Sequence, residues 1–211
     1  SDTTAVALAV AMKAERCEIY TDVDGIYTTD PRLTNRARKL AEIGFLEMLE
    51  MAALGAKMNP RSIELGLVYD MPIYVASSFS DEPGTLIHGG EHTMEVRKAV
   101  TGIAVDRNVG KITVRGVVDR PGVAAGLLQP LADAGISIDV ILQNTSSDGT
   151  TDFTFTVAQA DVETAAEISR TQPNVKFAEV VAGTGLAKVS IVGTGMENAP
   201  GYAARMFSTL A

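Results

Sequence analysis

The segment Thr21–Arg32, Thr-Asp-Val-Asp-Gly-Ile-Tyr-Thr-Thr-Asp-Pro-Arg, decides how the rest of the chain is interpreted. It follows the apolar-leaning run Cys17–Tyr20, which is typical of a β-strand. Its acids and threonines make it too polar for a core, and the pair Asp24-Gly25 favours a tight turn between extended arms. We therefore expect a surface loop that faces a ligand. A polar hairpin without any ligand is the alternative that these residues leave open.

One calcium-binding motif matches this segment in part. Asp22 and Asp24 have the spacing of the first two ligands of an EF-hand loop. That loop requires a glycine at its sixth position and a bidentate glutamate at its twelfth. Counted from Asp22, these positions hold Tyr27 and Leu33, so the motif is excluded.

Composition is that of an ordinary globular protein. With 211 residues, 46% hydrophobic and 21% charged, the chain can form one large or two small domains. The formal net charge of -8 argues against a nucleic-acid partner, because phosphate binding requires clustered lysines and arginines. The longest apolar run, residues 5–12, is far shorter than the roughly 20 residues of a membrane span. The single cysteine, Cys17, is expected to be a small buried side chain. These features predict a cytoplasmic protein with no membrane partner.

The first fifteen residues are expected to form a largely buried helix. Capping side chains at Ser1–Thr4 precede alanines that alternate with apolar residues up to Met12. Free amides and the positive dipole end at such a helix start suit an anion, and a simple cap is the alternative.

Helices and strands alternate after the central loop. Residues 45–56 form an amphipathic pattern, Pro60–Tyr69 predicts a second helix, and Pro72–Ala76 predicts a strand. Lys57 either reaches a phosphate or complements the end of the first of these helices. This alternation implies a mostly parallel α/β sheet.

A polar stretch, residues 88–98, is the predicted linker, with a domain boundary near Glu95. His88 and His92 lie four residues apart, a spacing that suits a metal on a helix. Two glycines lie between them and disfavour a helix, so we expect no metal site.

The second half contains two copies of one unit, in which a strand that ends in glycine precedes a Pro-Gly turn and a helix. The copies are Lys111–Gly116, Asp119–Gly122 and residues 123–133, and then Lys188–Gly193, Asn198–Gly201 and residues 202–211.

The first copy continues into a complete βαββαβ module. Strands are predicted at residues 138–143, 152–157 and 175–181, with a helix at 161–170. This order is ferredoxin-like. The second copy stops after its helix and has to pack against neighbours, because one strand and one helix cannot bury their own apolar faces.

These motifs resemble those of one family. Thr21–Arg32 is similar to the nucleotide-binding loop of aspartokinases, within the amino-acid kinase superfamily. Ser1–Ala5 is similar to the end of their Gly-Arg-Gly-Gly-Ser-Asp-Thr-Thr-Ala segment, and Phe45–Met48 and Gly55–Lys57 extend the match. The paired Pro-Gly units resemble their regulatory ACT modules. The resemblance covers nearly the whole chain.

The resemblance implies an α/β fold in three parts. Residues 1–95 would be the C-terminal part of an amino-acid kinase domain, a mostly parallel αβα sandwich. Residues 96–185 would be a ferredoxin-like ACT domain, and residues 186–211 the truncated start of a second one.

The resemblance also implies an aspartate kinase, which transfers the γ-phosphoryl group of Mg²⁺-ATP to the side-chain carboxylate of L-aspartate on the route to lysine, threonine and methionine. Ser1 and Asp2 would contact the substrate. The ATP-binding residues would be Ser1, Thr21, Asp22, Tyr27, Thr28, Asp30, Pro31, Arg32 and Lys57. The family's chief phosphate-stabilising lysine lies in an N-terminal Gly-rich segment that has no counterpart here. We therefore expect a truncated fragment without turnover.

In the ACT half the resemblance implies an amino-acid effector, lysine or threonine or both, and a homodimer or α2β2 assembly. One side of the effector pocket would be Asp119, Pro121, Gly122, Ala124, Gln143 and Asn144, and the other Asn198, Ala199, Pro200 and Gly201. Two alternatives stay open: an inactive regulatory subunit that binds lysine or threonine, and a glutamate or uridylate kinase, against which the paired modules argue.

Overall fold

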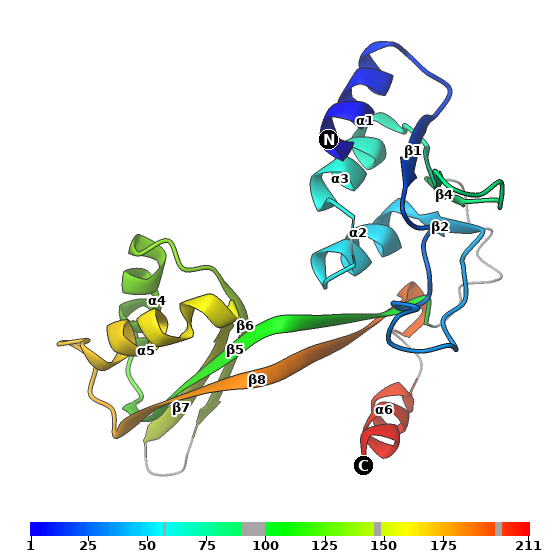
Figure 1. The fold of residues 1–211 in the computed structure, drawn as a ribbon. Coiled ribbons are helices and arrows are strands. Elements are labelled where there is room, and N and C mark those ends of the chain that lie inside the picture. Colours follow the sequence, from blue (N-terminus) through cyan, green and yellow to red (C-terminus); the bar gives the residue numbers. More distant parts are fainter. Residues whose placement is uncertain (57, 90–99, 146–148, 197–199) are drawn as a thin grey trace. The chain divides into compact units, whose positions relative to one another are not determined.

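The computed structural model describes residues 1–56, 58–89, 100–145, 149–196 and 200–211. It divides into two compact units (Figure 1). The first comprises Ser1–Val105 and Val189–Ala211, and the second comprises Asp106–Lys188. Across the described ranges, no helix is long and apolar enough to cross a bilayer.

The first unit contains a four-stranded sheet. Its strands lie in the order β1 (Cys17–Thr21), β3 (Ile73–Ser77), β4 (Thr85–His88) and β2 (Glu42–Gly44). The pairs β1–β3 and β2–β4 are parallel, and β3–β4 is antiparallel. The predicted mostly parallel α/β sheet is confirmed.

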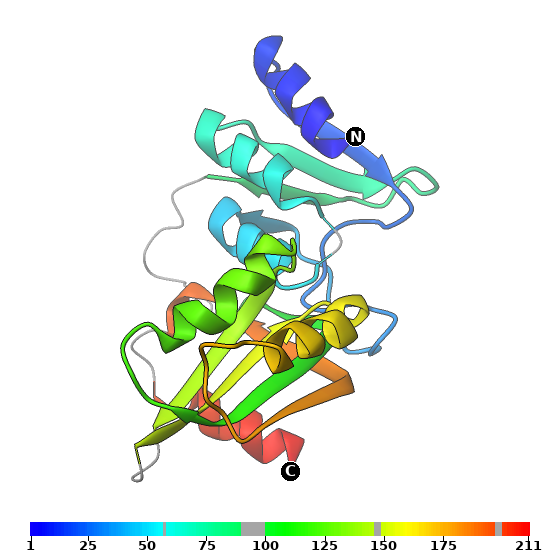
Figure 2. The same cartoon turned by 90° about the vertical axis from the view of Figure 1, so that its left-hand side faces the viewer.

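Three helices, α1 (Asp2–Ala11), α2 (Phe45–Ala53) and α3 (Pro60–Tyr69), lie along one face of this sheet (Figures 1 and 2). The amphipathic pattern of α2 buries Phe45 and Met48 in the core between helices and sheet. α3 begins at its proline as predicted, and the side chain of Asn59 caps it by accepting from the Arg61 amide.

The prediction that α1 is largely buried is wrong for this structure. Val6 is its single buried residue, whereas Leu8 is 58% exposed. α1 packs against α3 and β1 on one side, and its apolar residues are distributed around the helix. An all-round apolar pattern therefore does not by itself bury a helix that has neighbours on only one face.

The second unit is a ferredoxin-like βαββαβ module. Its sheet order is β6-β7-β5-β8, and both α-helices lie on one face of the sheet (Figures 1 and 2). Alternate residues of β7, including Phe153 and Phe155, pack into the core with Leu127 and Leu131 of α4. In chain order the elements are β5 (Gly102–Val118), α4 (Val123–Asp133), β6 (Ile138–Thr145), β7 (Thr150–Val157), η2 (Gln159–Asp161), α5 (Val162–Arg170) and β8 (Glu179–Val192).

The strands that begin each copy of the repeat are longer than predicted. Residues 111–116 are part of β5, and residues 188–192 form the end of β8, which starts at Glu179. β8 stays paired with β5, so no separate strand begins near Lys188. Gly185, with a φ of 74°, lies within β8 and is the residue type that tolerates such a conformation. The chain ends with η3 (Thr194–Met196) and α6 (Tyr202–Leu210).

Candidate functional site

The candidate site lies where β1 and β3 end. These neighbouring strands are parallel, and their last residues, Thr21 and Ser77, are partners in the register. Ligands of open α/β sheets bind beyond the carboxyl ends of the parallel strands. The long connection from β1 to β2, residues 22–41, begins there and contains most of the predicted nucleotide-binding residues.

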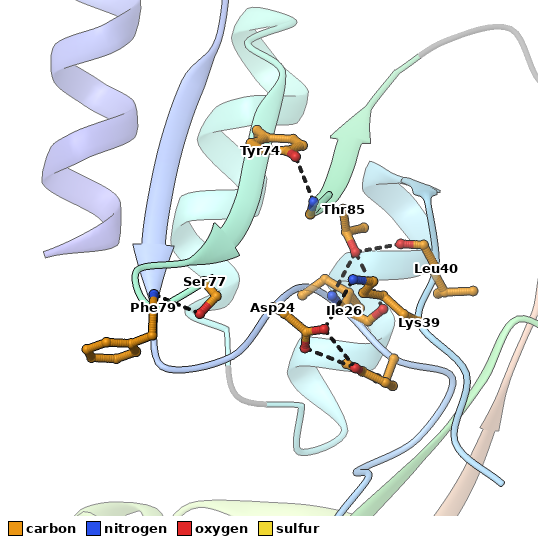
Figure 3. Close-up of polar contacts among 10 residues, drawn as sticks. Asp24, Ile26, Lys39, Leu40, Tyr74, Ser77, Phe79 and Thr85 are labelled. Atoms are coloured by element: carbon orange, nitrogen blue, oxygen red, sulfur yellow. Dashed lines mark hydrogen bonds and ion pairs between the residues drawn. The ribbon is translucent and has the colours of Figure 1, made fainter. Parts of the chain in front are cut away.

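Thr85, at the start of β4, holds both ends of this connection in place (Figure 3). Its buried hydroxyl accepts a hydrogen bond from the amide of Ile26 at 2.8 Å and donates one to the carbonyl of Leu40 at 2.6 Å. Gly25 lies directly against this hydroxyl: a Cβ there would approach the Thr85 Oγ1 to 2.6 Å. With a φ of 141° as well, this position requires glycine.

Asp24 is the centre of a second cluster in the loop. Its carboxylate accepts hydrogen bonds from the Tyr27 hydroxyl at 2.9 Å and from the Lys39 Nζ at 3.1 Å. Burial opposes ionisation of Asp24, but the hydrogen bonds from Lys39 and Tyr27 outweigh it and lower the pKa. Burial and then the bond to Asp24 raise the pKa of Tyr27, and the bond to Asp24 raises the pKa of Lys39. The cluster joins the two arms of the loop, which also meet in an antiparallel bridge between Tyr27 and Lys39.

Other predicted nucleotide-binding residues form hydrogen bonds within or next to the loop. Asp30 receives two hydrogen bonds from the Arg32 guanidinium, at 3.0 and 2.6 Å. The Thr21 hydroxyl donates to Asp22 at 3.1 Å. The Thr28 hydroxyl accepts from the amide of Arg38 at 3.1 Å. These bonds give the loop a defined shape, with Pro31 exposed at its surface.

Ser1 and Asp2 stand at the start of α1. The Ser1 carbonyl accepts from the Ala5 amide at 2.9 Å, as in an N-cap, and its hydroxyl donates to the Asp2 carboxylate at 3.1 Å. Lys57, the predicted auxiliary cation, lies outside the described residues. Within the parts of the chain that are described, no three His, Cys, Asp or Glu side chains converge as a metal site.

A cavity of about 530 Å³ opens beside the ends of β1 and β3. Its lining residues are Tyr20, Ser77, Ser78, Phe79, Ser80 and Asp81. Ser77–Asp81 are not among the ligand-binding residues predicted from the sequence. The available signal was a run of three serines around one phenylalanine directly after a predicted strand, because such strand ends face ligands in parallel sheets.

The predicted effector residues lie in both units. Gly122 and Gly201 precede α4 and α6 with φ values of 87° and 102°, and each carbonyl accepts from the amide four residues on at 3.0 Å. The glycine that precedes the helix therefore has a similar backbone conformation in both copies. In the second unit Asp119 and Pro121 precede α4, Ala124 lies in its first turn, and Gln143 and Asn144 are on β6. Pro200 is exposed in the first unit, and Asn198 and Ala199 lie outside the described residues.

Comparison with known proteins matches two separate segments of the chain to two families. The amino acid kinase family model matches residues 1–77, and the ACT domain model matches residues 112–168. The aspartokinase of Pseudomonas aeruginosa is 50% identical over the whole chain, which covers 52% of that protein. A solved regulatory subunit of aspartate kinase from Thermus thermophilus is 36% identical, with a TM-score of 0.50, and the match covers 54% of this chain and 76% of that one.

The chain belongs to the aspartokinase family. Its fold agrees with this, since Escherichia coli aspartokinase III, crystallised with aspartate and ADP, superposes with a TM-score of 0.80 at 30% identity. That match covers 99% of this chain and 47% of the other. The chain spans about half the length of the curated aspartokinases it matches.

Both predicted sites of this aspartokinase family member fall largely within the matched segments. Residues 1–77 include Ser1, the loop up to Arg32 and Lys57. Residues 112–168 include the first half of the predicted effector pocket. The ACT match does not include the second half of that pocket, which comprises Asn198, Ala199, Pro200 and Gly201.

Proposed function

We propose that this chain forms part of an aspartate kinase, which transfers the γ-phosphoryl group of ATP to the side-chain carboxylate of L-aspartate. A carboxylate oxygen bonds to the γ-phosphorus while the bond from that phosphorus to the β-phosphate oxygen breaks, which yields 4-phospho-L-aspartate and ADP. The observation that carries the proposal is the polar loop 22–41, held by Thr85 beyond the carboxyl ends of two parallel strands.

The loop residues fit a nucleotide. The Asp22 carboxylate, directly after β1, can accept hydrogen bonds from ribose hydroxyls. Arg32 is more than half exposed even though it is paired with Asp30, so its guanidinium is accessible to phosphate oxygens. Tyr27 supports the loop through Asp24, and Thr28 through Arg38. Lys57 would add a positive charge.

Ser1 would contact both the substrate and the phosphates from the start of α1, and Asp2 the substrate. The chemistry requires charge neutralisation and positioning more than covalent participation by the protein. Mg²⁺ would accompany ATP, because this ion is typically bound by substrate phosphates with one or two carboxylates and several waters.

The ACT half would bind an amino-acid effector. Escherichia coli aspartokinase III has been crystallised with lysine and aspartate, and that structure is 30% identical to this chain with a TM-score of 0.73. The helix start at Gly122 presents free amides that suit a carboxylate, and the polar residues Gln143 and Asn144 follow on β6. Lysine, threonine or both would be the effector of a protein on the pathway to these amino acids.

Assembly through ACT domains, as a homodimer or an α2β2 complex, is part of the proposal. The similarity to a Thermus thermophilus regulatory subunit supports it, because that protein is a subunit of an aspartate kinase. A cytoplasmic location stays a prediction from composition and the single cysteine.

A chimera tests the activity. This chain would replace the matching part of the Pseudomonas aeruginosa aspartokinase, and aspartyl hydroxamate formation would be measured with aspartate and with glutamate. We expect activity with aspartate, and a fall of at least tenfold in kcat/KM for ATP in Asp22→Asn. A folded chimera without activity, or one that prefers glutamate, would contradict the proposal.

The alternative is a regulatory subunit without catalytic function. The similarity to a solved regulatory subunit of aspartate kinase is the observation behind it, whereas the amino acid kinase match of residues 1–77 supports the kinase. Calorimetry on the 211-residue chain separates the two functions. ATP binding that Asp22→Asn weakens supports the kinase, whereas binding of lysine or threonine without any binding of ATP supports the regulatory subunit.

A further inference from the structure

The start of β5 is bonded to the proposed nucleotide loop. The amide of Ile103 donates a hydrogen bond to the carbonyl of Thr28 at 2.7 Å. Within the loop, the amide of Thr28 donates to the carbonyl of Arg38 at 2.9 Å. Thr28 is therefore held both by the other arm of the loop and by a strand outside it. This attachment adds to the two hydrogen bonds that Thr85 makes with the ends of the loop.

Gly102 lies directly against the same carbonyl group. A Cβ at this position would approach the carbonyl oxygen of Thr28 to 3.1 Å and the Sδ of Met51 to 2.9 Å. Gly102 and Met51 are both buried. Because such close packing leaves little free space, a shift of β5 at this point would displace Thr28 as well.

Thr101 fixes the start of β5. This residue is buried, and its hydroxyl donates to the Glu47 carboxylate in the first turn of α2 at 2.8 Å. Its amide donates at 2.8 Å to the carbonyl of Val192, which ends β8 and is 1% exposed in the core of the first unit. A hydrogen bond to a carboxylate is stronger than one between neutral groups. These two bonds tie the residue before β5 to α2 and to the core.

We propose that Thr101 is a positioning residue for nucleotide binding, although it lies outside the loop that would contact ATP. Its side-chain hydrogen bond fixes the start of β5, and the Ile103 amide in turn fixes Thr28. This inference rests on the proposed kinase function. Thr28 lies between Asp22 and Arg32, so a shift of its main chain would change how the proposed ribose and phosphate contacts meet one ligand.

Steady-state kinetics of the aspartokinase chimera test the inference. Thr101→Val keeps the shape of the side chain and removes the hydroxyl, and it is expected to raise KM for ATP about three- to tenfold, the range that one hydrogen bond corresponds to. The values of kcat and of KM for aspartate should change by less than about twofold, because the lost interaction acts on nucleotide binding. Thr101→Ser keeps the hydroxyl and should restore KM for ATP.

Three further variants complete the test. Gly102→Ala adds a methyl group against the Thr28 carbonyl and should raise KM for ATP at least as much as Thr101→Val does. Glu47→Ala removes the acceptor, so its effect and that of Thr101→Val on KM for ATP should be clearly less than multiplicative in the double variant. Thr113→Val is the matched control, since it removes a hydroxyl that bonds to another threonine in the second unit, and it should leave KM for ATP unchanged.

The outcomes separate this inference from the function on which it rests. A folded Thr101→Val chimera with an unchanged KM for ATP overturns the positioning role and leaves the kinase function standing. Losses of similar size in kcat and in both KM values also overturn it, because they would indicate general damage to the fold. If the unaltered chimera forms no aspartyl hydroxamate, the proposed function and the inference fall together. Urea unfolding establishes which variants are folded, and if Thr101→Val is not, the same criteria apply to Gly102→Ala.

Discussion

The Lys39 ammonium lies 3.1 Å from the Asp24 carboxylate, so an ion pair joins the two arms of the loop that leaves β1. Both groups are partly buried, and Tyr27 donates to the same carboxylate. The pair therefore links the shape of the proposed nucleotide loop to pH.

Asp24→Asn is expected to lower the free energy of unfolding by about 1 kcal/mol near pH 7, a value reduced for the partial exposure of the pair. The pKa of Asp24 is lowered in the folded state, so its contribution is present above the unfolded pKa of about 4 and is lost as the pH falls through the folded value. The pKa of Lys39 is raised, so its contribution is present below its unfolded value of about 10 and is lost at higher pH. Urea unfolding at several pH values checks this. Glu50→Gln, at an exposed position of α2, is the control. A difference in the free energy of unfolding between Asp24→Asn and the unaltered chain that persists at pH 2 would contradict the mechanism.

Thr85→Val is expected to destabilise the first unit by about 1–3 kcal/mol, because it removes the hydroxyl while keeping the shape of the side chain. The partly buried amide of Ile26 and the carbonyl of Leu40 would each lose a partner. Thr85→Ser keeps the hydroxyl and should be clearly more stable than Thr85→Val in urea. Equal stability of the two variants would contradict this prediction, because losing the hydrogen bonds would then cost no more than losing the methyl group.

Gly25→Ala is expected to cost at least 2 kcal/mol, because a φ of 141° strains any residue with a Cβ and that atom would lie 2.6 Å from the Thr85 hydroxyl. Combining it with Thr85→Ala removes the steric part, so a double-mutant cycle in urea should give a coupling energy beyond about 0.5 kcal/mol. Gly183→Ala, where no heavy atom lies within 4 Å of an added Cβ, is the matched control. A double-mutant cycle that gives no coupling energy would contradict direct contact between Gly25 and Thr85.

Cys17 should react slowly with a thiol reagent such as 5,5′-dithiobis(2-nitrobenzoate) while the protein is folded. It is 5% exposed, and burial raises its pKa, so little reactive thiolate is present near neutral pH. In urea the rate should rise at least tenfold. Fast labelling of the folded chain would show that β1 opens readily at this edge of the sheet.

Local patterns in the sequence were sufficient to predict most of the helices and strands. α3 and α4 have the predicted bounds, since a proline or a Pro-Gly turn marks each start and the apolar spacing marks each buried face. The order of strands and helices was enough to predict the ferredoxin-like module, and the spaced motifs were enough to predict the aspartokinase family. These features depend on neighbours within a few residues or on their order along the chain.

Only the tertiary structure showed which distant residues meet. Nothing local in the sequence pairs Gly25 with Thr85 or Asp24 with Lys39, because these contacts depend on the register of β4 and on the path of a twenty-residue loop. The exposure of α1 and the joining of two predicted strands into β8 were also decided by packing and sheet pairing. Ser77–Asp81 became a candidate site only once β1 and β3 were known to be parallel neighbours. Propensity and periodicity act over short separations, whereas a binding site is formed by chain segments that the fold brings together.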